Sequence, residues 1–408
     1  MEERHKAGRT KGVLFGGIRL GRLAGIDISI DWSLFIIFWL VALSLAMGVF
    51  PRWHPDWSSA LAWTVSLSAA ALFFVSVLLH ELSHALVARA FGVPVSEITL
   101  FLFGGLAQMK GEPTSPGAEL LIAGVGPLTS IVIGVVALLG GGWLAAEAVS
   151  LSLDNPVAFL RGVGPVATLL LWLGPINLIL GLFNLIPGFP LDGGRLLRAT
   201  VWWATGSMLK ATRWAAATGR AFAWFLMGIG AAMALGLQVP VLGTGFLNGL
   251  WLVLIGWFLN NAAHASYRQL EDTEMLKNVP VRSMMNTHVQ TVPLDLSVED
   301  LVNRRLLLSD QRAFPVLSDD LIVGLVTLED VRRVSSDRWG GTTVAQIMTP
   351  LSELSTVAPD NGAREALDVL VNRDINQVPV VDHGHLLGVL RRQDIMKWLM
   401  IRRQIHSN

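Results

Sequence analysis

The sequence predicts a polytopic α-helical membrane protein, with about six transmembrane helices and short membrane-associated β segments, followed by a cytosolic α/β tandem domain. Hydrophobic residues make up 52% of the 408 residues, too large a share for an ordinary soluble enzyme. Long apolar stretches recur up to about residue 265. The charged remainder repeats itself once, with a period of about 64 residues, and each copy reads as helix, strand, strand, helix.

Six stretches are apolar enough to cross a bilayer, which takes about 20 residues per helix. We expect them at residues 32–50, 59–91, 117–147, 163–187, 214–236 and 244–265. Two other stretches combine strand formers with glycine, and they predict a strand pair within 14–30 and a hairpin or re-entrant strand within 92–116. The expected domains are a membrane-surface segment at 1–31, a transmembrane domain at 32–266 and the tandem domain at 267–408.

Basic residues in the loops predict the orientation in the lipid bilayer, because lysine and arginine concentrate on the cytosolic side. The N-terminal arm and the 189–213 connection are the basic segments, with Arg4, Lys6, Arg9, Lys11, Arg19, Arg22, Arg195, Arg198, Lys210 and Arg213. The predicted outer loops carry only Arg52 and Arg161. Six spans then place both termini of a multi-pass cell-membrane protein in the cytosol, and the N-terminus does not resemble a cleaved signal peptide. Five or seven spans would leave the C-terminal domain outside.

Charge balance and the lack of cysteine exclude several classes of partner and site. The formal net charge is zero, so no electrostatic argument favours a nucleic-acid partner. The chain has no cysteine, which excludes disulfides, thiolate metal sites and cysteine nucleophiles. Any metal must therefore be held by histidine or by a carboxylate.

A His-Glu-x-x-His pattern interrupts the second apolar stretch. His80 and His84 are four residues apart, so on a helix both imidazoles face one side and can bind one metal ion. Glu81 stands beside them as a candidate general base. Each ionisable group in hydrocarbon costs about 2.5 to 3.5 kcal/mol, so three on one turn are hard to explain without a function. Zinc suits such a ligand pair. It would lower the pKa of its bound water from about 15.7 to about 7, so hydroxide becomes available at neutral pH.

A catalytic zinc usually takes three protein ligands, so a third residue is needed. Asp192 is the best candidate, because the prolines and glycines around it break the backbone and can aim a short side chain inward. Its alternative role is a helix N-cap. The Asn184 amide can donate a hydrogen bond to a developing oxyanion or form a hydrogen bond between helices. For Asn177 we expect the hydrogen bond between helices. The site requires residues 187–194 to fold back onto the histidine pair.

These motifs resemble the site-2 protease family of intramembrane zinc metalloproteases, in the group with C-terminal cystathionine-β-synthase-type (CBS) domains. The resemblance covers essentially the whole chain and rests on His80 to His84, Phe103 to Gly105, Ala123 to Pro127 and Asn184 to Gly194. It implies one Zn²⁺ ion bound by His80, His84 and Asp192, with Glu81 as the catalytic glutamate and Asn184 assisting the scissile carbonyl.

Of two further segments of the membrane domain, one resembles that family and the other departs from it slightly. Gly104-Gly105 resembles part of a strand that pairs with an unwound substrate. The third apolar stretch departs slightly from the family pattern, because Val125-Gly126 separates Ala123-Gly124 from Pro127 where a compact Ala-Gly-Pro is commoner. Either glycine can fill the role of the family's single glycine.

The C-terminal repeat resembles a CBS pair, which often binds adenine nucleotides. In such pairs a threonine or serine contacts phosphate, and an aspartate three residues later contacts ribose. Thr327 and Asp330 fit this pattern, whereas the second copy keeps Asp394 but has Arg391 at the hydroxyl position. The resemblance implies ATP, ADP or AMP at the first copy and weakens the case for a second site. The alternative is a structural or dimerising CBS pair without a ligand, and a homodimer is expected to form face to face.

Three functions are compatible with these residues. The first is regulated intramembrane proteolysis, in which a transmembrane substrate, trimmed first by another protease, unwinds and is cut with Glu81 as general base. The second is a CBS-gated divalent-cation transporter or channel, since intramembrane histidine and aspartate also line ion paths. A transport site needs no spare base, so Glu81 favours the protease. The third, an inactive scaffold, has little support because every expected catalytic position is filled.

Overall fold

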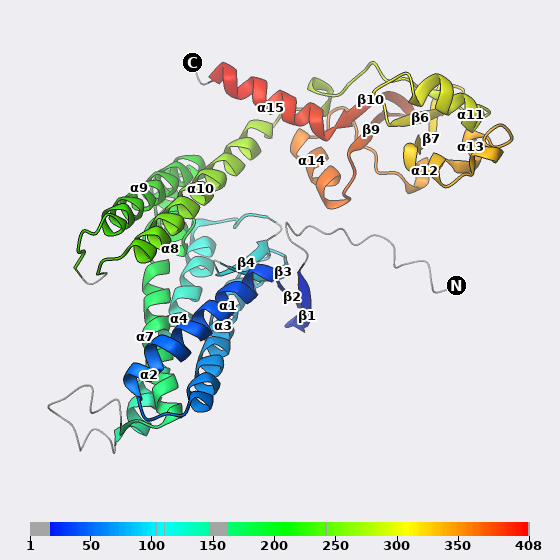
Figure 1. The fold of residues 1–408 in the computed structure, drawn as a ribbon. Helices are drawn as coiled ribbons and strands as arrows, with labels where there is room; N and C mark the ends of the chain where they lie inside the picture. Colours follow the sequence, from blue (N-terminus) through cyan, green and yellow to red (C-terminus); the bar gives the residue numbers. More distant parts are fainter. Residues whose placement is uncertain (1–16, 103, 110, 147–161, 241–242, 407–408) are drawn as a thin grey trace. The chain divides into compact units, whose positions relative to one another are not determined.

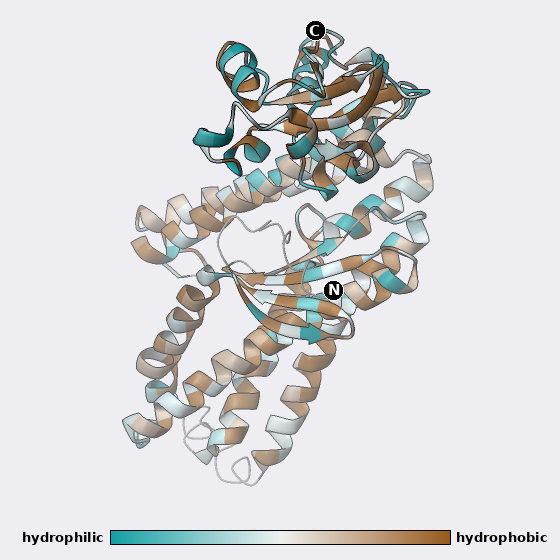
Figure 2. Ribbon diagram, turned by 90° about the vertical axis from the view of Figure 1, so that its right-hand side faces the viewer, coloured by the Kyte–Doolittle hydropathy of each residue, from teal (hydrophilic) through white to brown (hydrophobic). Residues whose placement is uncertain are grey.

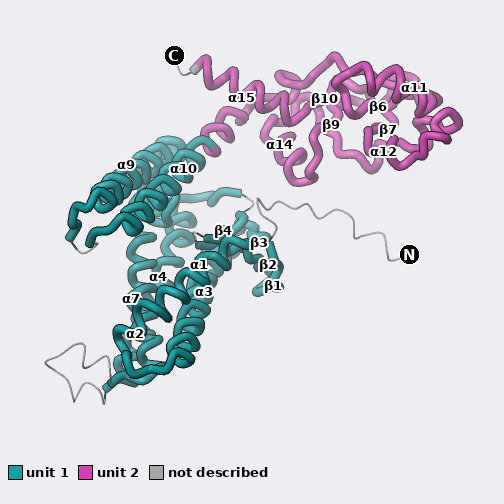
Figure 3. The backbone as a smooth tube through the Cα atoms, in the orientation of Figure 1, with its two compact units in different colours: residues 1–268 teal, residues 269–408 magenta. Residues whose placement is uncertain are grey.

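The computed structural model describes residues 17–102, 104–109, 111–146, 162–240 and 243–406 (Figure 1). Apolar residues dominate its long helices, whereas the C-terminal part mixes apolar strands with hydrophilic helices and loops (Figure 2). The chain divides into two compact units, residues 1–268 and residues 269–408 (Figure 3). Features that the sequence analysis placed at Arg4, Lys6, Arg9, Lys11, Phe103 and Arg161 lie outside the described residues.

Unit 1 is built mainly from long apolar helices. The described helices of this unit are α1 (Trp32–Ser44), α2 (Phe50–Trp53), α3 (Ser59–Ala90), α4 (Pro116–Leu144), α7 (Pro165–Asn184), α8 (Asp192–Thr205), α9 (Met208–Ala234) and α10 (Phe246–Leu276), which ends in unit 2. Within the described ranges, five segments are long and apolar enough to cross a membrane: Trp32–Trp53, α3, α4, α7 and α10. The predicted polytopic helical membrane domain is therefore confirmed.

The stretch predicted to span the membrane at 214–236 forms a helix but is not one of those five. Helix α9 covers residues 214–234 and carries Lys210, Arg213 and Arg220 among its apolar residues. It packs against α10 through small residues, since a Cβ at Gly230 would lie 2.6 Å from the carbonyl oxygen of Gly249. Such backbone contact is typical of helix pairs in membranes.

A four-stranded sheet accompanies the helices in the described part of unit 1. Its order is β1 (Ile18–Leu23), β2 (Ile26–Ile30), β3 (Val95–Phe101) and β4 (Gly104–Met109). Both strand pairs expected from the sequence are present, and each is antiparallel. A parallel pairing of β2 with β3, with Ile28 opposite Ile98, joins them into one sheet. Local sequence patterns do not predict this pairing, because it connects segments on either side of helices α1, α2 and α3.

The sheet packs on the C-terminal half of α3. Apolar side chains of the strands and of α3 form one buried core. It contains Ile26 and Ile28 of β2, Val95 and Ile98 of β3, and Leu82, Ala85 and Ala88 of α3. Arg89, at the end of α3, donates a hydrogen bond of 2.6 Å to the carbonyl oxygen of Ala24 in the β1–β2 turn. These contacts hold β4 against the helix that carries the histidine pair.

Helix α4 is central to unit 1, because it contacts α3, α7 and α8. Its contact with α7 is close. A Cβ at Gly134 would lie 2.9 Å from the carbonyl oxygen of Gly174, and one at Gly174 would lie 3.1 Å from that of Gly134. Glycine at both positions lets the two backbones touch, which fixes α4 within the bundle.

Unit 2 contains two copies of a helix–strand–strand–helix module, as the repeat predicts. The first copy has α11 (Val298–Leu301), β6 (Ala313–Ser318), β7 (Leu321–Thr327) and α12 (Leu328–Arg332). The second has α14 (Ala363–Asn372), β9 (Gln377–Asp382), β10 (His385–Arg391) and α15 (Arg392–His406). The short elements are β5 (Val292–Pro293), α13 (Val344–Ile347) and β8 (Thr349–Pro350).

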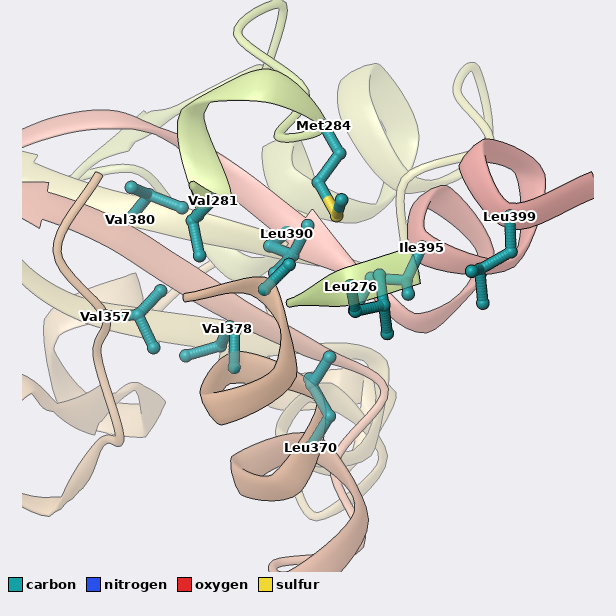
Figure 4. Close-up of a cluster of buried hydrophobic side chains, with 12 residues drawn as sticks. Leu276, Val281, Met284, Val357, Leu370, Val378, Val380, Leu390, Ile395 and Leu399 are labelled. Carbon is teal, nitrogen blue, oxygen red and sulfur yellow. The ribbon is translucent and has the colours of Figure 1, made fainter. Parts of the chain in front are cut away.

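The strands of unit 2 form one mixed sheet in the described residues, in the order β5-β6-β7-β10-β9, with β8 paired to β7. Each copy has its own apolar core. In the core of the second copy, Leu370 from α14 packs with Val378 and Leu390 from the strands (Figure 4). Leu276 and Val281, which precede the first copy, belong to the same core. The entering segment therefore completes the second copy.

Candidate metal centre

Three of the predicted site residues come together in unit 1. His80 and His84 lie one turn apart on α3, and Asp192 is the first residue of α8. The Oδ2 atom of Asp192 is 3.1 Å from Nε2 of each histidine, and the two Nε2 atoms are 3.2 Å apart. Both histidines are buried and Asp192 is nearly so. The fold-back of residues 187–194 that the sequence analysis required is present.

The three facing atoms present lone pairs to one another. Nδ1 of His84 lies 2.6 Å from the carbonyl oxygen of Ile122, which only accepts, so Nδ1 carries the proton. Nδ1 of His80 lies 2.9 Å from Oγ of Ser130, which can accept a hydrogen bond from a protonated Nδ1. With neutral imidazoles, both Nε2 atoms then direct lone pairs towards a carboxylate oxygen. Electron pairs at such distances repel, and a cation between them removes the repulsion.

The donor set and its spacing fit zinc. Tetrahedral zinc with bonds of about 2.0 to 2.1 Å holds its ligand atoms roughly 3.3 Å apart, close to the separations of 3.1 and 3.2 Å observed here. Two histidines and one carboxylate form a ligand set of catalytic zinc sites, which leave a fourth position open. The hydrogen bonds at both Nδ1 atoms orient the rings, as partners of metal-binding histidines usually do.

Gly126 brings the backbone of α4 against the histidine pair. A Cβ at Gly126 would overlap the ring of His84 and lie 2.7 Å from Nε2 of His80. A Cβ at Gly124 would meet only Leu196, at an ordinary distance of 3.8 Å. Of the two glycines that the sequence analysis left open, Gly126 is therefore the one that lies against the site.

The turn between α7 and α8 delivers Asp192 by close backbone packing. Cβ atoms at Gly193 or Gly194 would overlap main-chain atoms of the turn, those of Leu185 and Gly188 respectively. Phe189 donates its N–H to the carbonyl oxygen of Ala215 on α9, at 3.0 Å. The N-cap of α8 is Leu191, so the alternative role of Asp192 as N-cap is wrong.

Glu81 lies between the metal centre and the sheet. A Cβ at Gly105 of β4 would lie 3.1 Å from Oε1 of Glu81 and closer still to its side-chain carbons, so only glycine fits there. Glu81 also lies within electrostatic range of His84, Asp192 and Arg195. The carboxylate therefore stands beside the ligands without being one of the three converging groups.

The two asparagines of α7 bond within their own helix. The amide of Asn184 donates to the carbonyl oxygen of Leu180 at 3.1 Å, and Asn184 is partly exposed. Asn177 is buried and its amide donates to Leu173 at 3.0 Å. These hydrogen bonds assign neither residue to the interhelical role that we considered.

Known proteins share the features of both units. Peptidase family M50 matches residues 68–228, and the CBS domain matches residues 281–337 and 344–401. "Putative zinc metalloprotease Rip3" of Mycobacterium tuberculosis is 35% identical over 392 residues, which are 95% of this chain and 93% of that protein. The chain belongs to peptidase family M50.

Two other comparisons concern Methanocaldococcus jannaschii. Its "Zinc metalloprotease MJ0392" is 29% identical over 94% of this chain and 96% of that protein. Its solved site-2 protease structure has 31% identity, covers 62% of this chain and 95% of that one, and gives a TM-score of 0.40. This M50 chain is thus a membrane metallopeptidase with tandem CBS domains, as the motifs predicted.

A buried ion pair in the M50 domain was missed from the sequence. Glu119 on α4 is fully buried, and its Oε1 accepts a hydrogen bond of 2.6 Å from Nε of Arg198 on α8. Arg195, one turn after Asp192, approaches the same oxygen to 4.0 Å. The signal was available, since an acid at the start of an apolar stretch requires a partner. In the sequence, Arg195 and Arg198 indicate only a basic loop.

The CBS residues differ between the two copies. Oγ1 of Thr327 donates to Oδ2 of Asp330 at 2.7 Å, and the two residues form a reciprocal capping box at the start of α12. In the second copy, Nε and Nη2 of Arg391 each donate to Asp394 at 2.8 Å. These bonds raise the pKa of the Arg391 guanidinium. The Asp394 carboxylate is therefore already hydrogen-bonded to the Arg391 side chain.

Proposed function

We propose that this M50 peptidase is an intramembrane endopeptidase whose zinc ion is held by His80, His84 and Asp192. The observation that carries the proposal is the convergence of two imidazole nitrogens and one carboxylate oxygen within 3.2 Å of one another. The ligands lie on helices of an apolar unit. The substrate is accordingly a transmembrane segment of another protein, and prior trimming by a second protease would release it to enter.

The residues around the zinc have distinct roles in the proposed reaction. Zinc at this site supplies a Lewis acid that activates water at neutral pH. Glu81 takes the proton of the attacking water and passes it to the leaving amine. Asn184 turns its amide from Leu180 towards the developing oxyanion when the substrate is bound.

Strand β4 is the proposed docking place of the substrate. It is an edge strand of the described sheet, and edge strands offer unpaired backbone groups to another extended chain. Gly105 of β4 lies against Glu81. A substrate segment that unwinds and pairs with β4 would therefore bring its peptide bond beside the general base.

Replacement of Glu81 by Gln tests the mechanism. The variant should bind one zinc ion per chain like the wild type, yet fail to cleave a co-expressed transmembrane substrate. Unchanged cleavage would remove Glu81 from the mechanism. Zinc flux in proteoliposomes distinguishes the peptidase from the transporter alternative. A peptidase should carry no zinc flux. A flux that His80→Ala abolishes would favour transport and contradict the proposal.

For the membrane arrangement, we propose that α9 is the sixth crossing and that both termini lie in the cytosol. The close packing of α9 on α10 supports a membrane position, and the basic residues of α8 and of the start of α9 support a cytosolic α8–α9 connection. The absence of cysteine makes a direct test possible. A cysteine at Ser207 should resist an impermeant thiol reagent added to intact cells, and a cysteine at Asp56 should react; the opposite pattern contradicts the orientation.

For the CBS unit, we propose that the first copy binds one adenine nucleotide and that occupancy changes protease activity. Thr327 and Asp330 supply a hydroxyl and a carboxylate at the end of β7, whereas Arg391 neutralises Asp394. Calorimetry of the full chain with ATP, ADP and AMP should give one site per chain, and Asp330→Asn should remove it. Absence of heat with all three would leave a structural pair. Association of the CBS pairs into a homodimer is part of the same proposal and is measured by sedimentation.

A further inference from the structure

One face of α4 contacts both histidines proposed to hold the metal and an arginine of α8, the helix that begins at Asp192. Glu119, Ile122, Gly126 and Ser130 follow one another at spacings of three and four residues, so they form a single buried stripe on the helix. Ser130 contacts Nδ1 of His80 and Ile122 contacts Nδ1 of His84. Gly126 lets the helix approach the rings. The remaining member, Glu119, contacts neither histidine and reaches α8 instead.

Glu119 holds α8 by its charge. Its Oε1 accepts from Nε of Arg198 at 2.6 Å and also contacts Nη2 of that residue. Its Oε2 is buried and has no hydrogen-bond donor among the described residues. The side chain of Arg198 is only 11% exposed. A charge so buried needs its counter-charge, because an unpaired ion in an apolar interior is very costly. The pair therefore fixes how far α8 lies from α4.

Arg198 also contacts the turn that precedes Asp192. Its guanidinium lies over the ring of Phe189, 5.4 Å from the ring centre, within the range of a cation–π contact. Phe189 is buried three residues before Asp192. The Arg198 side chain thus joins α4, α8 and the turn, and it restrains both the rotation of α8 and the backbone on either side of Asp192.

We propose that Glu119 is a positioning residue for the third metal ligand, acting through Arg198. One helix then orients every ligand: Ser130 orients His80, Ile122 orients His84, and Glu119 with Arg198 orients Asp192. The inference rests on the proposed zinc site. Outer partners of zinc ligands typically change metal affinity 10- to 100-fold when they are replaced. Glu119 acts at one remove, so its loss should weaken zinc binding about tenfold.

The test measures zinc affinity by competition with a chelator, and thermal stability of the zinc-free protein, in the full chain. Glu119→Gln leaves Arg198 buried without its counter-charge and should lower both quantities. Glu119→Gln combined with Arg198→Met removes both charges and should recover the thermal stability, because replacing a buried pair by apolar groups is often neutral. Its zinc affinity should stay about tenfold below the wild type, since the positioning contact is still missing. A purely structural pair would recover both.

Two more variants keep the inference decidable if Glu119→Gln fails to fold. Arg198→Lys retains the charge but loses the planar group that bonds Glu119 and covers Phe189, and it should bind zinc several-fold more weakly than the wild type. Glu97→Gln is the matched control, because Glu97 accepts a hydrogen bond from Ser29 between β3 and β2, away from α8; it should retain wild-type affinity.

The outcomes separate this inference from the zinc site itself. Wild-type affinity in the double variant or in Arg198→Lys overturns the positioning role and leaves the zinc site standing. His84→Ala is expected to bind no zinc. If the wild-type chain also binds none, both the proposed function and this inference are overturned. Weakened zinc binding in a double variant of normal stability supports both.

Discussion

The Oδ2 atom of Asp192 lies 3.1 Å from Nε2 of His80, although 112 residues separate the two in the sequence. The same oxygen lies 3.1 Å from Nε2 of His84. Helices α3 and α8 therefore meet at their ionisable groups within a mainly apolar unit. Neither helix has to bury an uncompensated charge when a cation is present, which links metal binding to the stability of this contact.

Removal of the Asp192 charge should abolish stable zinc binding. Asp192→Asn keeps the shape of the side chain but offers zinc a neutral ligand, so the affinity should fall by more than the roughly 10- to 100-fold that loss of an outer partner typically costs. Elemental analysis after dialysis should find about one zinc per wild-type chain and almost none in the variant. Asp27→Asn, which alters a partly exposed carboxylate on β2, serves as the control. Full zinc content in Asp192→Asn would show that this carboxylate is not a ligand.

Alanine at Gly126 should impair the metal centre, whereas alanine at Gly124 should not. The added Cβ at Gly126 overlaps the ring of His84, while that at Gly124 has ordinary contacts. Both positions lie on α4, so the gain in helix propensity is the same. Zinc content and cleavage of the substrate measure the difference. Equal behaviour of the two variants would contradict the close approach of α4.

Replacement of Arg391 by Thr should open a second nucleotide site. The substitution removes the two hydrogen bonds that occupy Asp394 and restores a hydroxyl at the position matching Thr327. Calorimetry should then give two nucleotides per chain in place of one. Asp394→Asn in the same background should return the stoichiometry to one. A stoichiometry that stays at one after Arg391→Thr would mean that Arg391 is not what closes the second copy.

Leu370 should contribute strongly to the stability of the second CBS copy, and its neighbour Val371 should not. Leu370 is fully buried in the core seen in Figure 4, whereas Val371 is 56% exposed on the same helix. Leu370→Ala should lower the free energy of unfolding of unit 2 by about 2 to 5 kcal/mol. Val371→Ala should change it by less than about 0.5 kcal/mol. Hydrogen exchange of β9 and β10 reports both, and similar protection in the two variants would contradict this core.

The local features of the chain were readable from the sequence. The apolar stretches and the repeat gave the membrane helices and the two α/β copies, because periodicity within a few residues decides which face of an element is apolar. The same reasoning placed His80 and His84 on one side of a helix. It also indicated a span at 214–236. Helix α9 there carries Lys210, Arg213 and Arg220 among its apolar residues, and it is not one of the five described segments that are long and apolar enough to cross a membrane.

The relations between distant segments were only partly accessible. The broken backbone around Asp192 suggested that it could reach the histidines, but not how the turn packs on α9 through Phe189. Nothing local distinguished Gly126 from Gly124, or indicated that β2 pairs with β3. The Glu119–Arg198 pair joins residues that are 79 positions apart. The sequence indicates that an acid in an apolar stretch needs a partner, but not which cation lies opposite it.

The sequence by itself determined which elements form and which chemical groups each one carries: two histidines and a glutamate on α3, an aspartate at the start of α8, and two unequal CBS copies. Only the tertiary structure decided that one stripe of α4 touches both histidines and the arginine that secures α8. The physical reason is that helix formation depends on neighbours three or four residues away. The meeting of α3, α4 and α8 depends on how closely glycine-lined backbones can pack.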